Sequence, residues 1–435
     1  MNPAVAGILG SLLLVVLLFL GMPIAFVMMF VGFLGISYLT SVSAALPVAA
    51  KTIYETAAHY PYTIIPLFIL MGGFAGSAGI TKELYETFDK WFRRFPGGLG
   101  IATITACAFF AALSGSSVAA AAAMGTIAIP EMRRFNYAPK LAVGVVAAGG
   151  TLSFLIPPSL GFVVYGMLTE QSIGKLLISG IFPGILLSLA FIAIIVIQVK
   201  RDPRLAPATP GEVSFKEKIL AFSGVWETLL VFFLVMGGIY LGFVNPTEAG
   251  AIGATALFAI ALLKRKITLK NLSASLLETI RISVLVLFLV AGANVFSYFL
   301  ALSTIPMVVS TWMAGLHVSR YIILAIVVVI YLILGCFLDA ISMMVLTMPV
   351  IFPVIQALGF DPIWFGVICV IMMEAGLITP PVGLNVYTLA GVVKDVPMQT
   401  IFRGALPFLI SMIAVVILIT IFPEICLFLP SMMGR

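Results

Sequence analysis

Residues Gly376 to Asn385 read Gly-Leu-Ile-Thr-Pro-Pro-Val-Gly-Leu-Asn, and they interrupt an apolar segment that runs from about Ile363 to Val393. Two consecutive prolines remove backbone donors and exclude helical geometry at the residue before them, Thr379. The segment is long enough to span a bilayer, so the sequence predicts a helix that breaks within the membrane. Such a break is tolerated only where the freed polar groups are buried in protein or line a polar cavity.

The same device occurs earlier in the chain, where Ser153 to Ser159 reads Ser-Phe-Leu-Ile-Pro-Pro-Ser. An offset of 223 residues takes Pro157 to Pro380 and Pro158 to Pro381. The same offset relates two further pairs of prolines: Pro23 with Pro246, and Pro130 with Pro353. We therefore predict that the chain consists of two repeats of one structural plan.

The composition excludes a soluble globule and indicates an integral membrane protein. Hydrophobic residues make up 62% of the 435 residues and charged residues only 9%, which leaves too little polar surface to cover a soluble protein of this size. Roughly ten apolar stretches have the length of about 20 residues that a helix needs to cross a bilayer. We predict an all-α membrane protein whose first apolar run is a retained span, because Met1 to Ala6 carries no Lys or Arg.

The first repeat is predicted at 1–200, with a re-entrant hairpin at about 97–130 and a broken helix at about 141–168. The hairpin is inferred from Arg93 and Arg94 before it and from further basic residues after it. If positive charge marks the cytoplasm, both ends of the stretch lie on one side of the membrane, which a hairpin satisfies and a single span does not. We place its turn at Ser114-Gly-Ser-Ser117.

A Pro-containing polar segment, 201–222, is predicted to be a cytoplasmic linker. The second repeat follows at 223–435, with its hairpin at about 321–355 and its broken helix at about 363–393. Each repeat then holds five spans and one hairpin. This odd number of crossings inverts the second repeat relative to the first, which is the plan of many secondary transporters.

The cations set a predicted orientation. With the linker in the cytoplasm, every Lys and Arg falls on the cytoplasmic side except four: Lys51, Lys175, Arg320 and Arg435. Both chain termini are therefore predicted on the outer side.

Several smaller elements are expected between these landmarks. Lys51 to His59 should form a weakly polar connection, and Thr81 to Arg94 an amphipathic surface helix capped by Thr81. A span is expected at Ile282 to Leu302 and a short helix at Pro306 to Leu316. The stretch Asn245-Pro-Thr-Glu248 has the pattern of a helix start, with Pro in the first turn and Glu placed to bond back to the cap.

Oxygen-rich residues of the first half form the first candidate site. The turn Ser114 to Ser117 is expected to meet the break Ser153 to Ser159 near mid-membrane. Hydroxyls and unwound carbonyls are hard oxygen ligands that suit Na⁺, and half-helix N-termini favour an anionic substrate group. Small residues also allow close helix packing, which is the simpler alternative and the one we favour for Ala119 to Ala123.

Asp339 marks the second candidate site. It corresponds to Ser116 by the offset of 223 residues, and it lies in an apolar hairpin where an unpaired carboxylate is costly. We expect it to bind a cation together with oxygens of Gly376, Thr379 and Pro380. A proton-carrying Asp and an Asp that only caps a helix are the alternatives.

Two further polar residues lie near the second break. Glu374 can tune the cation site electrostatically or hydrogen-bond a neighbouring helix, and Asn385 can face substrate or bond a helix. The sequence has no Gly-x-x-x-x-Gly-Lys-Ser/Thr loop, so ATP is not the direct energy source on this chain.

Four motifs in order resemble the large membrane subunit of tripartite ATP-independent periplasmic (TRAP) transporters, the DctM-like family. They are Leu113-Ser-Gly-Ser-Ser117, Ile156-Pro-Pro-Ser159, Asn245-Pro-Thr-Glu-Ala249 and Ile378-Thr-Pro-Pro-Val-Gly-Leu-Asn385. Each motif alone is weak, but the resemblance covers essentially the whole chain.

The resemblance implies a secondary active carrier of the elevator type rather than an enzyme. It implies uptake of a small organic acid, such as a C4-dicarboxylate or sialic acid, coupled to Na⁺ across a bacterial inner membrane. It also implies two partners, a small four-helix membrane subunit on a separate chain and a periplasmic substrate-binding protein.

The family's cation sites carry over onto nine residues: Ser114, Ser116, Ser117, Ser153 and Pro157 in one half, and Asp339, Gly376, Thr379 and Pro380 in the other. The family usually has Gly where this chain has Ser153, so that ligand relies on the Ser carbonyl keeping the same place. Three further residues are candidates for substrate contact: Ser159, Ser342 and Asn385.

Two other functions compete with this one. A stand-alone Na⁺- or H⁺-coupled dicarboxylate or ion carrier of similar fold would need neither partner. An intramembrane hydrolase is disfavoured, because His59 and His317 lie outside the predicted spans and Asp339 has no second Asp beside it.

Overall fold

A computed structural model describes the chain except for residues 1, 208–212, 309–310, 312–317 and 434–435. The described residues form helices joined by short turns, with no strand among them. Most of the short helix expected at Pro306 to Leu316, the segment 208–212 of the linker, and Arg435 lie outside the described residues.

The helices of the first half are α1 (Pro3–Phe19), α2 (Ile24–Leu39), α3 (Val42–Ala58), η1 (Tyr60–Thr63), α4 (Ile64–Ser77), α5 (Ile80–Phe92), α6 (Gly98–Ser114), α7 (Ser117–Arg134), α8 (Pro139–Leu155), α9 (Leu160–Thr169), α10 (Ile173–Ser179), α11 (Ile181–Arg201) and η2 (Pro203–Leu205). Those of the second half are α12 (Phe215–Ala221), η3 (Phe222–Gly224), α13 (Trp226–Phe232), η4 (Phe233–Gly237), α14 (Gly238–Tyr240), α15 (Pro246–Leu263), α16 (Leu269–Leu302), α18 (Arg320–Gly335), α19 (Ala340–Ala357), α20 (Pro362–Gly376), α21 (Leu384–Val392), α22 (Met398–Ile421) and α23 (Glu424–Met432).

Length and composition make six of the described helices able to cross a membrane, or up to eight if each of two bent pairs counts as one span. One bent pair is α8 with α9, which meet at an angle of 43° around the first Pro-Pro pair. The other joins α12 and η3 to α13 and its continuation at 45°. The remaining apolar helices have 10–17 residues, in part because Gly and Pro end them early, as at Gly21 and Pro23 between α1 and α2.

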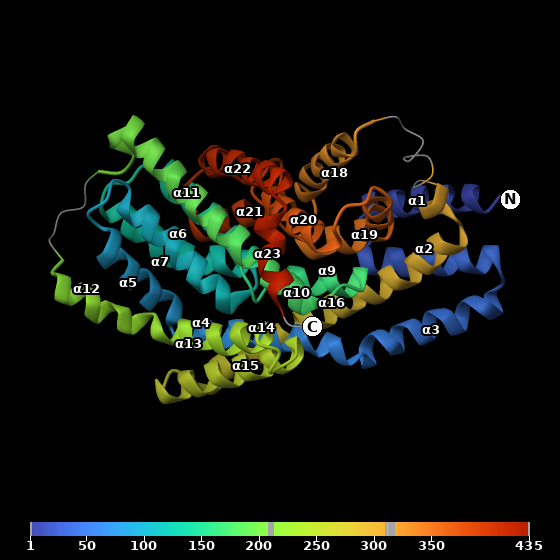
Figure 1. Cartoon of the computed structure of the whole chain (residues 1–435), viewed down its shortest axis with the longest axis horizontal. Coiled ribbons are helices and arrows are strands. Elements are labelled where there is room, and N and C mark those ends of the chain that lie inside the picture. Colours follow the sequence, from blue (N-terminus) through green and yellow to red (C-terminus); the bar gives the residue numbers. More distant parts are fainter. Residues whose placement is uncertain (1, 208–212, 309–310, 312–317, 434–435) are drawn as a thin grey trace.

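The helices gather into two regions (Figure 1). Helices α1 to α3 lie at the right-hand end, where the long helix α16 packs along α2 and α4. At the other end, α6, α7 and α8 pack on one another, and α22 covers α8. Helix α5 and the short α12 lie on the outside of this second group. The chain between α4 and α6 therefore connects the two regions through α5.

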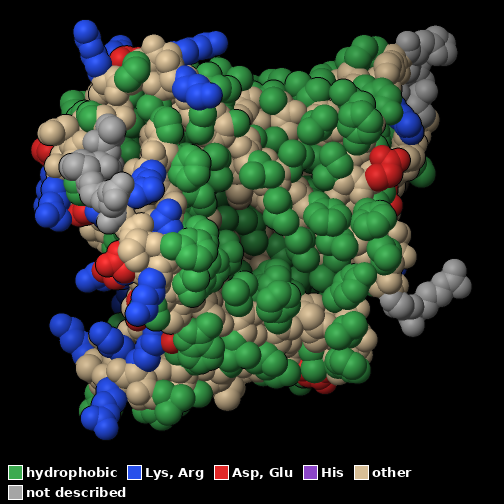
Figure 2. Space-filling view, turned by 60° about the vertical axis from the view of Figure 1, so that its left-hand side comes forward, with side chains coloured by type: hydrophobic (Ala, Val, Ile, Leu, Met, Phe, Trp, Pro, Cys, Tyr) green, Lys and Arg blue, Asp and Glu red, His purple; other side chains and the backbone are tan. Residues whose placement is uncertain are grey.

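The surface is that expected for a protein surrounded by lipid. Figure 2 shows a broad, mostly hydrophobic face with a hollow near its middle. Lys and Arg side chains gather along the left-hand edge of this face. A wide apolar band bordered by cations is typical of a membrane protein whose basic loops lie on one side.

Two predictions of local structure are wrong, and a third element is longer than predicted. The expected connection Lys51 to His59 is mostly helical, because α3 continues to Ala58 despite its polar residues and internal Pro47. The predicted cap Thr81 lies inside α5, since Gly79 at φ +77° turns the chain and the helix begins at Ile80. The span expected at Ile282 to Leu302 lies within a longer helix, α16, which begins at Leu269 because charged residues with good helix propensity lengthen a helix rather than end it.

The linker also contains more regular structure than a flexible segment would. Its second part forms α12, and a capping box between Ser214 and Glu217 fixes the start of that helix. A second capping box, between Asn245 and Glu248, starts α15 with Pro246 in the first turn, as the sequence predicts.

Candidate functional site

The turn between α6 and α7 consists of Ser114, Gly115 and Ser116. Gly115 has φ +60°, a left-handed conformation that favours glycine, and it reverses the chain after α6. Ser116 then caps α7, where its hydroxyl accepts from Ala119 N at 3.4 Å. The Ser114 hydroxyl donates to the Ser116 carbonyl at 3.4 Å, so three oxygen-bearing groups lie together in one tight turn.

This turn contacts the first Pro-Pro break. A side-chain carbon at Gly115 would lie 3.4 Å from the Pro158 carbonyl oxygen, which measures how closely the two segments approach. On the far side of the break Ser159 caps α9, where its hydroxyl accepts from Phe162 N at 3.3 Å and donates to the Phe154 carbonyl. Ser153 is fully buried, and its hydroxyl has no hydrogen-bond partner among the described residues.

The turn between α18 and α19 ends at Asp339, which caps α19. Its Oδ1 accepts from Ile341 N at 3.1 Å and from Ser342 N at 3.0 Å. The capping role considered from the sequence is therefore present. Both bonds use Oδ1, and the half-buried side chain also lines a cavity. Oδ2 therefore remains available to bind a ligand.

This second turn contacts the second Pro-Pro break. A side-chain carbon at Gly335 would lie only 2.7 Å from the Gly376 Cα atom, so the two backbones touch. Gly383 N also donates to the Cys336 carbonyl at 3.4 Å. Each hairpin turn is thus packed against the break of its own half.

Polar groups at the second break are only partly satisfied. The Thr379 hydroxyl donates to the Ala375 carbonyl at 2.7 Å, which leaves the lone pairs of its oxygen available to a ligand. The side chain of Asn385 is fully buried, and neither its oxygen nor its nitrogen has a partner within the described part of the chain.

The two breaks differ in accessibility. Pro157 and Pro158 are buried, whereas Pro380 and Pro381 are exposed at the surface. Both Pro-Pro peptide bonds are cis.

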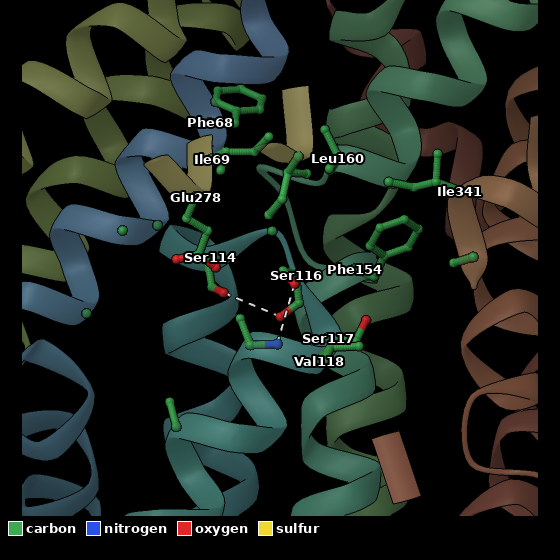
Figure 3. Close-up of a pocket in the computed structure, with 18 of the residues that line it drawn as sticks. Phe68, Ile69, Ser114, Ser116, Ser117, Val118, Phe154, Leu160, Glu278 and Ile341 are labelled. Atoms are coloured by element: carbon green, nitrogen blue, oxygen red, sulfur yellow. Dashed lines mark hydrogen bonds between the residues drawn. The ribbon is translucent and has the colours of Figure 1, made fainter. Parts of the chain in front are cut away.

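A cavity of about 580 Å³ lies where the two hairpin turns face α4 and α16. Its walls come from both halves of the chain. Among its lining residues are four of the predicted site residues, Ser114, Ser116, Ser117 and Asp339. Figure 3 shows the serine turn in this cavity, with Phe154 and Leu160 of the first broken helix beside it.

The other predicted site residues do not line this cavity. Five of them are candidate cation ligands and three are candidate substrate contacts: Ser153, Pro157, Gly376, Thr379 and Pro380, then Ser159, Ser342 and Asn385. They lie at the two breaks and at the helix ends beside them.

One wall of the cavity was not anticipated from the sequence. Asn271, Ser275 and Glu278 of α16 line it, and Figure 3 shows Glu278 extending towards the serine turn. They follow one another at intervals of three and four residues, which places them on one face of a helix. That spacing was the available signal, but it does not reveal what the face contacts.

The sequence allows two roles for Glu374, and the structure shows that it bonds a neighbouring helix. The Ser117 hydroxyl of α7 donates to Glu374 Oε1 of α20 at 2.7 Å, and both residues are buried. This contact joins residues 257 positions apart and therefore links the two halves at the cavity.

The donor set around the cavity suits a hard monovalent cation rather than a transition metal. The described residues contain no group of three or more His, Cys, Asp or Glu side chains that could hold a metal ion. What the turns and breaks offer instead is hydroxyls, backbone carbonyls and single carboxylates, which are the oxygen ligands that transporters use for Na⁺.

A second polar cluster, outside the cavity, holds α5 in place. Lys264 Nζ donates to Glu83 of α5 and to Glu227 of α13, each at 2.6 Å. Burial alone would lower the pKa of Lys264, but these two hydrogen bonds outweigh it and raise the pKa above its usual value. Thr87 and Trp91 of α5 also donate to carbonyls of the linker region, at 2.8 and 3.0 Å.

Comparison with known proteins identifies the family. The family model for the DctM component of tripartite ATP-independent periplasmic transporters matches residues 11–425. The chain is 38% identical over 386 residues to the C4-dicarboxylate TRAP transporter large permease protein DctM of Pseudomonas aeruginosa, covering 88% of this chain and 90% of that protein. It is 31% identical to the sialic acid TRAP transporter large permease protein SiaM of Vibrio cholerae, covering 96% of each.

A third relative is longer than this chain. The isethionate TRAP transporter permease protein DctMQ of Oleidesulfovibrio alaskensis is 34% identical, and the match covers 94% of this chain but 64% of that protein. Among solved structures, the Alcanivorax borkumensis YdaH transporter matches with a TM-score of 0.68 at 15% identity, covering 98% of both chains, which shows likeness of fold alone. The curated relatives are permease proteins of transporters, in agreement with the expectation that the chain is not an enzyme.

Proposed function

The chain belongs to the DctM family of TRAP transporters as a large permease subunit, and from this we propose that it imports a small organic acid together with Na⁺. The substrate class is a C4-dicarboxylate or a similar carboxylate, as the names of relatives suggest. The site of action is the bacterial inner membrane, with both termini in the periplasm.

One observation supports the proposed coupling to Na⁺. The cavity brings the serine turn of the first hairpin and Asp339 of the second hairpin to a common space. Serine hydroxyls, the carbonyls at the turns and a carboxylate supply hard oxygen ligands there, and capping leaves Asp339 Oδ2 available. The proposed Na⁺ ligands are the nine carried over from the family: Ser114, Ser116, Ser117, Ser153 and Pro157 in one half, and Asp339, Gly376, Thr379 and Pro380 in the other.

The transport step is proposed to be an elevator movement. The two hairpins and the two broken helices would move together, because each hairpin turn packs against the break of its own half and Ser117 bonds Glu374 across the halves. Helices α4 and α16, which form the opposite wall of the cavity, would remain in place. The two halves are proposed to be inverted repeats, at 1–200 and 223–435, joined by the linker.

Two partners are part of this proposal. The first is a small four-helix membrane subunit on a separate chain. A periplasmic binding protein would deliver the acid, and Ser159, Ser342 and Asn385 are the proposed substrate contacts on this chain.

The deciding experiment is uptake of radiolabelled organic acids into proteoliposomes that hold this chain and its small membrane subunit. We expect uptake only with an inward Na⁺ gradient and added binding protein. Uptake without the binding protein would favour the competing function, a stand-alone Na⁺- or H⁺-coupled carrier. Uptake driven equally well by a proton gradient without Na⁺ would contradict the proposal that Na⁺ is the coupling ion.

A further inference from the structure

Glu374 is the most deeply buried carboxylate of the cavity wall, and only one of its two carboxylate oxygens accepts a hydrogen bond from the described residues. The residue is 1% exposed. Its Oε1 accepts from the Ser117 hydroxyl at 2.7 Å. Its Oε2 is buried and has no hydrogen-bond partner among the described residues. A buried carboxylate oxygen without a partner is costly, so the position requires an explanation.

The surroundings of Glu374 do not balance its charge. The described residues that line the cavity include three acidic side chains, Glu278, Asp339 and Glu374, but no Lys, Arg or His. A neutral hydroxyl such as that of Ser117 orients a carboxylate but contributes no positive charge. Either a proton on the carboxylate or a cation bound beside it can supply the balancing charge, and the two can be told apart by experiment.

We propose that Glu374 Oε2 is a ligand of a monovalent metal cation, Na⁺, bound between the first hairpin and α20. This inference rests on the proposed function, because it takes the coupling ion to be Na⁺. Ser117, itself one of the proposed ligands, also positions the carboxylate, since its hydrogen bond to Oε1 fixes the side chain with Oε2 free. The inference adds a charged ligand to the first-half serine turn, which otherwise offers only neutral oxygens.

The proposed cation site would be formed by residues from both halves of the chain. Ser117 belongs to α7, while Glu374 lies on α20, two residues before Gly376. Gly376 in turn touches Gly335 at the second hairpin. A cation held at Glu374 therefore stabilises the arrangement in which both hairpins and α20 are together. Binding at one half then changes the affinity for the cation at the other half.

The test measures Na⁺ binding directly and does not depend on transport. Equilibrium binding of radioactive Na⁺ is compared for the purified wild-type chain and for Glu374→Gln, which keeps the side-chain volume and an oxygen that can accept from Ser117. We expect Glu374→Gln to bind one Na⁺ fewer per chain or to bind Na⁺ at least about tenfold more weakly. Ser117→Ala, which keeps the carboxylate, is expected to show a smaller loss of affinity.

The matched control is Glu55→Gln, the same chemical change at an exposed carboxylate that pairs with Lys51 at 3.4 Å. It should bind Na⁺ as the wild type does. If the wild type binds Na⁺ and Glu374→Gln is unchanged, this inference is overturned while the proposed function stands. If the wild type binds no Na⁺, both fail.

A second measurement uses the unaltered chain, in case Glu374→Gln does not fold. Dicyclohexylcarbodiimide modifies carboxyl groups in apolar surroundings, and mass spectrometry of peptides locates the modified residue. We expect NaCl, but not choline chloride, to slow modification of Glu374. Modification at the same rate in both salts would overturn the inference and would favour a protonated Glu374.

Discussion

Ser116 and Asp339, separated by 223 positions, occupy the same structural position, since each caps the second helix of its hairpin. Ser116 accepts from the amide of Ala119 at 3.4 Å, and Asp339 accepts from the amide of Ser342 at 3.0 Å, three residues on in both cases. The two turns share the same type of helix cap, but only Asp339 carries a charge. Loss of the cap and loss of the charge can therefore be separated at Asp339.

Asp339→Asn should keep the cap of α19, because an Asn oxygen accepts the same bonds, and its thermal stability should stay near that of the wild type. Asp339→Ala should lose about 1 kcal/mol, as is typical when a cap is removed. Both variants should lose Na⁺-driven uptake, because neither carries the charge. Thermal unfolding and proteoliposome uptake measure the two effects. An Asp339→Asn protein with wild-type Na⁺ dependence would leave Asp339 with a capping role alone.

Gly335→Ala should destabilise the protein by about 1–3 kcal/mol, because the added carbon meets the Gly376 backbone and overpacks the contact. It should also weaken Na⁺ binding, since it forces the second hairpin away from its break. Gly391→Ala is the control, as a side chain there meets nothing within 4 Å. Thermal unfolding and Na⁺ titration of both variants check this, and equal melting temperatures would contradict the contact.

Lys264→Met should cost about 2 kcal/mol of stability, because it leaves Glu227, which is 3% exposed, as a buried carboxylate without its cation. The double variant Lys264→Met, Glu227→Gln should recover most of the loss. Lys82→Met is the control, because its pair with Glu86 is exposed and should change stability by about 0.5 kcal/mol or less. A double variant no more stable than the single one would show that the unpaired Glu227 carboxylate does not cause the loss.

A pH effect is expected where α7 meets the loop after α21. The hydrogen bond from Arg133 lowers the pKa of Asp395. A carboxylate with a lowered folded pKa adds stability above its unfolded pKa of about 3.9, and this is lost as the pH falls through the folded value. The difference in stability between the wild type and Asp395→Asn should therefore be constant above about pH 5 and shrink below about pH 4. Because Asp395 is exposed, added salt should reduce the difference at every pH.

The sequence predicts the local features of the site well. The turn at Ser114 to Ser117 follows from a glycine flanked by serines, which supply the left-handed residue and the helix cap that such a turn needs. The capping box at Asn245 and the interruption at Pro157 are equally local, because a few neighbouring residues determine them. The four motifs that contain these features also predict the family, and the match over residues 11–425 confirms it.

The contacts between distant segments could not be predicted in the same way. The bond between Ser117 and Glu374 spans 257 positions, and the spacing of residues along one helix does not say which other helix faces it. The same limit applies to Glu278, whose helix face was recognisable but whose neighbour was not. Helix α3 was missed for a different reason, because hydropathy detects membrane spans and α3 holds Lys51 and Glu55 within its helix.

The unequal burial of the two Pro-Pro breaks has a kinetic consequence. At the first break, where Pro157 and Pro158 are buried, a proposed ion would leave only after helices separate, so the rate of that opening would set its residence time. At the second, where Pro380 and Pro381 reach the surface, the affinity of the site alone would limit departure. If both breaks hold the proposed ions, the ion at the second break is therefore expected to leave before the ion at the first.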